Sequence, residues 1–248
     1  MAQSYTPIYC CHKQGQFCTH DHLNVNLIAD PDLLPHLLGE EEKITRLYID
    51  ADKCSYETTE TRKILVSWMF AVCEEYHTNA PVFQTAVWLT DMVCLNTEVD
   101  RSKLQLTGTA ALHIASKLRD CYPIPVAQLA WLTENSSTVA EILDTEQTIL
   151  KSFNWWIPSI SPADFVCPLL LHLGRPPDSL SSCYEEVNRN IHRALFCYNC
   201  MQLSFSELAS AAVGYTLGLQ DCLRAGPREM FIFEACVGHF APTLFEQQ

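Results

Sequence analysis

The chain has 248 residues, of which 48% are hydrophobic and 18% charged, a composition typical of a soluble globular protein with one or two domains. Its 29 acidic and 16 basic residues give a formal net charge of -13. An electrostatic field of that sign repels phosphate backbones and anionic lipids, which excludes nucleic acid and membrane surfaces as expected partners. No apolar run is long enough to span a membrane, and no basic segment near the start leads into an apolar one, so secretion is not expected either.

The 13 cysteines are an odd number, and most lie in apolar stretches such as MFAVCEEY at residues 69–76. A thiol in such a stretch behaves as a small hydrophobic side chain. We therefore expect free thiols in a reducing compartment.

Apolar residues at spacings of three and four fill the segments between the 8 glycines and 13 prolines, which predicts an all-helical protein. Residues 1–25 lack this periodicity and are interpreted as an extended or loosely attached arm. Residues 30–49 predict a short helix, or two short helices separated at Pro35 and Gly39.

A first set of helices follows a polar loop. Residues 61–76 carry an apolar stripe wide enough to be buried on more than one side, so we expect a central helix there. Thr138 and Glu141 have the spacing of a capping box, in which each side chain bonds an exposed amide at a helix start. The other helices predicted in this set span residues 81–95, 101–119, 126–133 and 139–153.

A second helical set begins after a short proline-containing linker, with Ser161 as N-cap and Pro162 in the first turn. Two further pairs have capping-box spacing, Ser182 with Glu185 and Ser204 with Glu207. The helices predicted in this set span residues 162–173, 183–198, 205–220 and 228–239. Two successive sets of similar length indicate a duplicated bundle.

The sequence contains no Gly-rich phosphate loop, no GxSxG elbow and no HExxH motif, so no enzyme site is indicated. The strongest metal candidate is the segment CCHKQGQFCTHDH, but it lacks two separated ligand pairs, and a Cys/His-rich flexible arm is the favoured interpretation. Its candidate ligands are Cys10, Cys11, Cys18, His20 and His22.

Two other features have an ordinary interpretation. Cys197 and Cys200 form a CxxC pair with no second pair near it in sequence, which favours a structural role. His113 lies among Ala, Leu and Ile, and an interior imidazole is favoured there over a catalytic base.

Three segments resemble a known family. TRKILVSWMFAVCEEY at residues 61–76 resembles the signature helix of the cyclin box, and KLQLTGTAALHIASKLRD at 103–120 resembles its third helix. DTEQTILKSFNWWI at 144–157 resembles the fifth helix, and the spacing among the three agrees. The resemblance implies an all-α protein with two tandem five-helix cyclin folds, at residues 61–158 and 159–248, after an N-terminal helical arm at 1–60.

In function, the resemblance implies a subunit without catalytic residues or cofactor that binds and activates a cyclin-dependent protein kinase. The positions that match the family's contacts to the kinase's movable helix are Lys117 and Glu146. Apolar residues that flank this pair in sequence complete the implied surface, and they are Leu118, Phe153, Trp155 and Ile157. The alternative for the charged pair is an ordinary surface ion pair that serves no partner.

Cyclins also hold substrates in a groove on the first helix, and the matching positions here are Ile64, Leu65, Trp68 and Gln105. Two residues depart from the family pattern. Thr61 replaces a Met, and Ala71 replaces an acidic residue that pairs with an arginine of the docking peptide. We therefore expect weakened docking of basic substrate or inhibitor motifs.

Three regulatory motifs are missing from the sequence: an RxxL destruction motif before the box, an LxCxE motif, and a Pro/Ser/Thr-rich acidic tail. A cyclin without them resembles the gammaherpesvirus cyclins, viral relatives of the D-type class. That resemblance implies action on the host cell cycle, in the nucleus and cytoplasm of the host cell. Two alternatives stay open, a helical adaptor of the cyclin fold with a non-kinase partner, and a metal-binding protein that uses the N-terminal arm.

Overall fold

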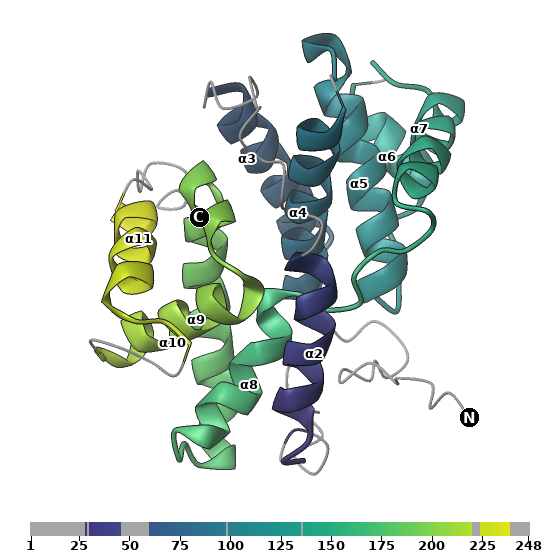
Figure 1. Ribbon diagram of the computed structural model, residues 1–248. Coiled ribbons are helices and arrows are strands. Elements are labelled where there is room, and N and C mark those ends of the chain that lie inside the picture. The colour runs from purple at the N-terminus through teal and green to yellow at the C-terminus, as the bar shows by residue number, and fades with distance from the viewer. Residues whose placement is uncertain are drawn as a thin grey trace.

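The computed structural model describes residues 28, 30–45, 60–97, 99–134, 136–219 and 224–238. Within these ranges the regular elements are helices, in two bundles with a further helix beside them (Figure 1). The predicted all-α class is therefore confirmed. Within the same ranges, no helix has the length and apolar character needed to cross a membrane.

The first bundle contains a helix that is buried on every side. This helix is α4 (Ala80–Asn96), whose residues are buried without interruption from Pro81 to Cys94. α3 (Glu60–Glu75) and α5 (Leu104–Arg119) pack against α4, whereas η3 (Arg101–Lys103), α6 (Val126–Leu132) and α7 (Val139–Ser152) pack against α5. The expectation of a central helix at residues 61–76 is wrong, because α3 buries only one face and leaves Ile64 and Ala71 exposed.

The second bundle follows a short linker. Its members are α8 (Pro162–His172), η4 (Pro177–Ser179), α9 (Leu180–Leu195), η5 (Tyr198–Gln202), α10 (Phe205–Leu217) and α11 (Pro227–Gly238). α8 ends at Gly174, whose φ of 74° suits a residue without a Cβ, and the Arg175 amide then bonds the Leu170 carbonyl. The helix thus ends within a residue of the boundary at 173 that the sequence predicts.

Capping boxes set the starts of some of the helices. Thr138 with Glu141 at α7 and Ser204 with Glu207 at α10 form the predicted capping boxes. The predicted box at Ser182 is wrong, because α9 begins earlier, at Leu180, directly after the 3-10 turn η4. The Ser182 hydroxyl instead donates to the carbonyl of Ser179.

The segment before the first bundle forms one continuous helix, α2 (Leu33–Thr45), rather than two pieces. Pro35 lies in its first turn, where the missing N–H has no helical partner to lose. α2 lies beside α8 (Figure 1), and its Glu41 is buried against the start of α10. There the Glu41 carboxylate accepts hydrogen bonds from the amide and the hydroxyl of Ser206, both at 2.6 Å.

Two polar clusters join the bundles. In the first, the Arg62 guanidinium of α3 bonds both carboxylate oxygens of Asp91 on α4, at 2.8 and 2.7 Å. The same guanidinium donates to the carbonyls of Leu195 and Phe196, at the end of α9. Because each bundle supplies groups to this buried cluster, it fixes α3 and α4 against α9.

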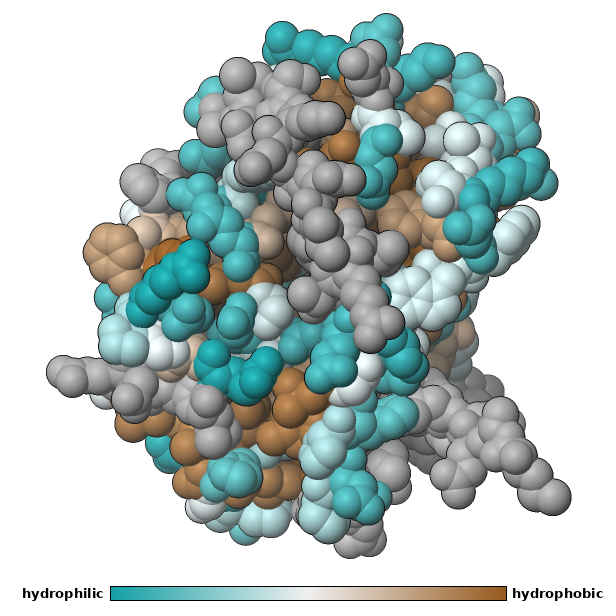
Figure 2. All heavy atoms as spheres, in the orientation of Figure 1, coloured by the Kyte–Doolittle hydropathy of each residue, from teal (hydrophilic) through white to brown (hydrophobic). Residues whose placement is uncertain are grey.

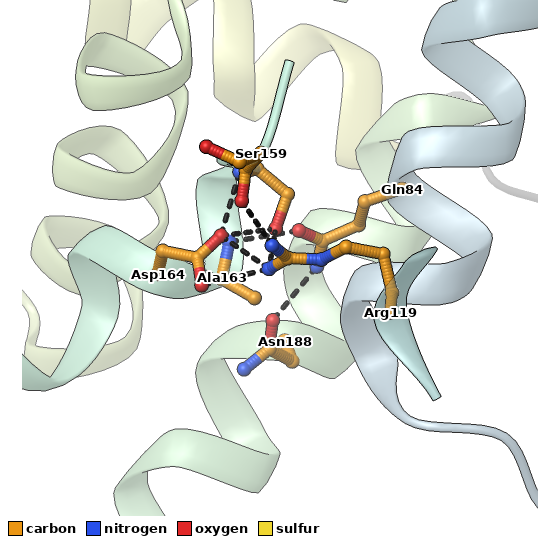
Figure 3. A network of polar contacts seen from close by, with 7 residues as sticks. Gln84, Arg119, Ser159, Ala163, Asp164 and Asn188 are labelled. Carbon is orange, nitrogen blue, oxygen red and sulfur yellow. Dashed lines mark hydrogen bonds and ion pairs between the residues drawn. The ribbon is translucent and has the colours of Figure 1, made fainter. Parts of the chain in front are cut away.

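The second cluster surrounds the linker (Figure 3). Arg119, at the end of α5, donates to both oxygens of Asp164 and to the carbonyl of Ser159. Beside it, the Gln84 amide accepts a bond from the Ala163 amide and donates to Asn188, at 2.8 and 2.7 Å. These bonds hold the start of α8 and the middle of α9 against α4 and α5.

On the outer surface, hydrophobic side chains form separate patches among hydrophilic ones (Figure 2).

Candidate protein-binding surface

α5 and α7 pack side by side and bring three charged or titratable side chains together. The Lys117 ammonium of α5 donates to Oε1 of Glu146 on α7. The ring nitrogen Nδ1 of His113 lies 2.9 Å from Oε2 of the same carboxylate. His113 and Lys117 are one helical turn apart on α5, so both reach the same face of α7.

The three side chains differ in their access to solvent. The Glu146 side chain is 10% exposed and that of His113 is 9% exposed, whereas 41% of the Lys117 side chain is exposed. Burial, followed by the Lys117 ammonium, lowers the pKa of His113 below its usual 6.5, although the Glu146 carboxylate opposes this shift. His113 is thus neutral near pH 7, and Lys117 is the charged group that faces outward.

Two of the four predicted apolar flanking residues are exposed. Leu118 is 52% exposed and Trp155 is 64% exposed. Phe153 is half-buried, with its ring 6.0 Å from that of Trp88, and Ile157 packs against the hydrophobic core. Phe153 and Ile157 therefore support this surface from below rather than form its outer face.

The turn after α7 holds Trp155 in an uncommon backbone conformation. Asn154 and Trp155 have φ values of 51° and 62°, in the left-handed region that bulky side chains rarely adopt. The Trp155 amide bonds the Leu150 carbonyl at 2.8 Å and closes the turn. Such strain costs about 1–2 kcal/mol per residue and is found where function requires a fixed side chain.

Exposed large apolar side chains gather along this part of the chain. Of the twelve within the described ranges, seven come from the segment between α5 and the turn after α7. They are Leu118, Tyr122, Trp131, Val139, Leu143, Trp155 and Trp156. Exposed apolar side chains of this kind mark a protein-binding surface where they adjoin one another.

The predicted groove residues lie on α3 and α5, which pack together at Gly108. A Cβ atom at Gly108 would come within 2.9 Å of Cδ1 of Leu65, so the glycine permits this close approach. Ile64 and Gln105 are exposed and Trp68 is half-buried, whereas Leu65 is buried in the core. The side chain of Leu65 thus fills the space beside Gly108, and the docking role of these four residues stays a prediction.

Comparison with known proteins decides the family. Residues 33–158 match the family model described as the cyclin N-terminal domain. The chain belongs to the cyclin family. It is 31% identical over 147 residues to a cyclin homolog of Saimiriine herpesvirus 2 (strain 11), which is 59% of this chain and only 58% of that relative. It is also 28% identical over 198 residues to the G1/S-specific cyclin-D2 of Gallus gallus, 79% of this chain and 68% of that relative.

The solved structures agree on the fold of this cyclin. The X-ray structure of a viral cyclin from herpesvirus saimiri matches 85% of this chain and 99% of that chain, with a TM-score of 0.75 and 23% identity. The predicted cyclin fold and the resemblance to viral and D-type cyclins are thus confirmed.

The candidate metal ligands of the cyclin's N-terminal arm lie outside the described residues. They are Cys10, Cys11, Cys18, His20 and His22. In the part of the chain that the structure describes, no group of three or more His, Cys, Asp or Glu side chains could hold a metal ion. The CxxC pair lies at η5, where Cys200 is buried in the hydrophobic core.

Sequence reasoning missed the buried ion pair of this cyclin, Arg62 with Asp91. A signal was available, since Asp91 is the one charged residue of the buried helix α4. A charge inside a fully buried helix requires a partner of opposite sign. The sequence could not show that the partner is Arg62, 29 residues earlier.

Proposed function

We propose that this cyclin is a non-catalytic regulatory subunit that binds and activates a cyclin-dependent protein kinase. Family membership supports the class of partner. The observation that carries the proposal is the partly exposed Lys117 side chain, held by buried Glu146, with exposed Leu118 and Trp155 flanking this pair in sequence. Charge and rigid apolar area side by side suit a partner surface that is itself amphipathic.

The physical role of such a surface follows from what a kinase needs. Its strand lysine must pair with a glutamate on a movable helix, and its activation loop must be displaced. A rigid bundle that binds the active arrangement more tightly than the inactive one shifts the kinase toward activity. Here the α4–α5–α7 packing supplies the rigidity, and Lys117 with Trp155 supplies the contacts.

The test compares two exposed aromatic residues on different bundles. Trp155→Ala removes the exposed indole next to α7, and Phe231→Ala removes a ring on α11 that is 72% exposed. Purified chains are mixed with inactive cyclin-dependent kinases, and co-elution and phosphate transfer to a protein substrate are followed. Trp155→Ala should weaken binding by about tenfold or more, as expected for a tryptophan central to an interface. Phe231→Ala should leave binding unchanged.

Two outcomes would contradict the proposal. If the unmodified chain forms no complex with any such kinase, the kinase role fails and the helical adaptor with another partner takes its place. If Phe231→Ala and Trp155→Ala weaken binding equally, the surface at α5 and α7 is not the one used. Measured zinc in the purified chain, lost with the Cys10 to His22 segment, would instead favour the metal-binding alternative.

The proposal extends to weakened inhibitor control. Ala71 is exposed on α3, on the same face as Ile64 and Trp68, and offers a methyl group rather than a carboxylate. An arginine of a docking peptide therefore loses a charged acceptor there. Ala71→Glu should bind an Arg-containing docking peptide roughly tenfold more tightly, whereas Gln202→Glu, which adds the same charge on η5, should not. Equal affinity for Ala71→Glu and the unmodified chain would contradict this part.

The proposal also places the protein in the nucleus and cytoplasm of a host cell, where it drives the cell cycle. The similarity to the cyclin homolog of Saimiriine herpesvirus 2 supports this setting. Microscopy of a fluorescent fusion in infected cells tests it. Exclusive accumulation in another compartment would contradict it.

A further inference from the structure

His113 is a polar residue in the buried middle of α5. Its neighbours Leu112 and Ile114 are in the hydrophobic core, and His113 itself is 7% exposed. Nothing in the packing of α5 requires an imidazole at this position, since an apolar side chain would be equally buried. The contact that uses the ring is the 2.9 Å approach of Nδ1 to Oε2 of Glu146.

The chemistry of this contact fixes the position of the ring proton. An ionised carboxylate has no proton to donate, so Nδ1 carries the hydrogen and donates it to Oε2. Burial and the nearby Lys117 ammonium disfavour a second proton on the ring. His113 is therefore a neutral donor with Nε2 unprotonated.

The two bonds to Glu146 divide its carboxylate between two donors. Oε2 is occupied by His113 and Oε1 by Lys117, and both donors come from one face of α5. A glutamate held at one oxygen can turn about its side-chain torsions, whereas one held at both oxygens has a fixed plane. The second bond thus orients the acceptor to which Lys117 is attached.

We propose that His113 is a positioning residue for partner recognition, which holds Glu146 so that the Lys117 ammonium faces the partner in one direction. This inference rests on the proposed kinase-binding function. Since 41% of the Lys117 side chain is exposed, the ammonium has donors left for the partner. The partner group is an acceptor, either a carboxylate or a main-chain carbonyl on the kinase's movable helix.

A double-mutant cycle tests this role. His113→Leu removes the donor and keeps an apolar side chain, whereas His113→Asn keeps an N–H close to the position of Nδ1. Each change is made in the unmodified chain and in Lys117→Met, and the affinity for the kinase is measured by calorimetry. In the unmodified background, His113→Leu should weaken binding about fivefold to tenfold, and His113→Asn should recover most of the loss. In the Lys117→Met background, His113→Leu should cause no further loss.

A merely structural histidine gives a different result. If His113→Leu weakens binding by the same factor in both backgrounds, it acts through general destabilisation, and the inference is overturned. No loss in either background also overturns it. If the unmodified chain binds no kinase, the proposed function fails and the role of His113 fails with it.

A measurement on the protein alone gives an independent check. Nitrogen NMR of the imidazole at pH 7 should show a protonated Nδ1 and an unprotonated Nε2 for His113. In Glu146→Gln the amide can turn its own N–H₂ toward the ring, so this preference should weaken. A ring protonated at Nε2 in the unmodified chain would overturn the inference, whatever the kinase measurements show.

Discussion

Two cation–carboxylate pairs of the first bundle differ in what surrounds the cation. Arg62 and Asp91 are each 2% exposed in their side chains, and the guanidinium also donates to two carbonyls at the end of α9. Lys117 pairs with Glu146, whose side chain is 10% exposed, but 41% of the Lys117 side chain lies in solvent. The guanidinium of the enclosed pair, Arg62 with Asp91, donates to groups within the molecule, so this pair joins the bundles. The ammonium of the half-open pair, Lys117 with Glu146, retains donors for another molecule.

The largest expected effect comes from opening the enclosed pair. Arg62→Met leaves the Asp91 carboxylate buried without its partner, which should lower the free energy of unfolding by about 3–5 kcal/mol. Urea denaturation followed by circular dichroism measures this change. The double variant Arg62→Met with Asp91→Leu should recover much of the loss, because neither residue then buries a charge. A loss below about 1 kcal/mol for Arg62→Met would show that the pair does not hold the bundles together.

The second largest effect is expected from acid, which should destabilise the same contact of α3 and α4 with α9. The His192 ring packs against those of Phe70 and Phe83, with centroids 5.7 and 5.0 Å away, and burial lowers its pKa from 6.5 to about 4. Between pH 6.5 and 4 the His192 imidazole is protonated in the unfolded chain but neutral in the folded one. The free energy of unfolding is therefore unaffected by His192 above pH 6.5 and decreases as the pH falls toward 4. The loss is up to about 3 kcal/mol at 1.36 kcal/mol per pKa unit.

The control for acid sensitivity is His192→Phe, which keeps a ring beside Phe70 and Phe83 but removes the titrating nitrogens. The unfolding free energy of the unmodified chain minus that of His192→Phe should fall by up to about 3 kcal/mol as the pH falls from 6.5 to 4, since only the histidine protein loses this contribution. Parallel curves over that interval would assign the acid sensitivity to other groups. Acid should also lower the free energy of unfolding through His113, because burial lowers the pKa of that imidazole as well.

The smallest effect on stability is expected at the half-open pair itself. Lys117→Met should cost about 1 kcal/mol or less, because solvent screens the exposed ammonium and Glu146 keeps the bond from His113. Kinase affinity should fall at the same time. Chemical denaturation and calorimetry on one preparation measure both quantities. A stability loss as large as that of Arg62→Met would remove the distinction between the two pairs.

Local signals explain why most of the fold could be predicted from sequence. The capping boxes at Thr138 and Ser204 each depend on four consecutive residues. Their hydrogen bonds therefore form if the helix begins directly after the Thr or Ser, whatever the rest of the chain does. The same signal at Ser182 was misleading because η4 and Leu180 had already begun α9 one turn earlier. Likewise, Pro35 is a helix breaker only when it lies beyond the first turn, and the sequence did not show where α2 begins.

Burial of the candidate site could not be predicted in this way. The resemblance implied Lys117 and Glu146 as neighbours, and the structure brings them together, but their role toward a kinase stays a prediction. The enclosure of Glu146 and its bond to His113 depend on how α5 packs against α7, which sequence spacing does not specify. The carbonyl of Leu195 that meets Arg62 is 133 residues away, beyond the range of any local pattern.

The contact between Glu41 and Ser206 has a consequence for the order of events during synthesis. The two residues are 165 positions apart, and a ribosome that adds 5–20 residues per second needs on the order of 10–30 s to join them. Throughout that interval the N-terminal amides of α10, to which Glu41 binds, do not yet exist. α2 is therefore made before α3 to α11, yet it reaches its final place only after the ribosome has built most of the second bundle.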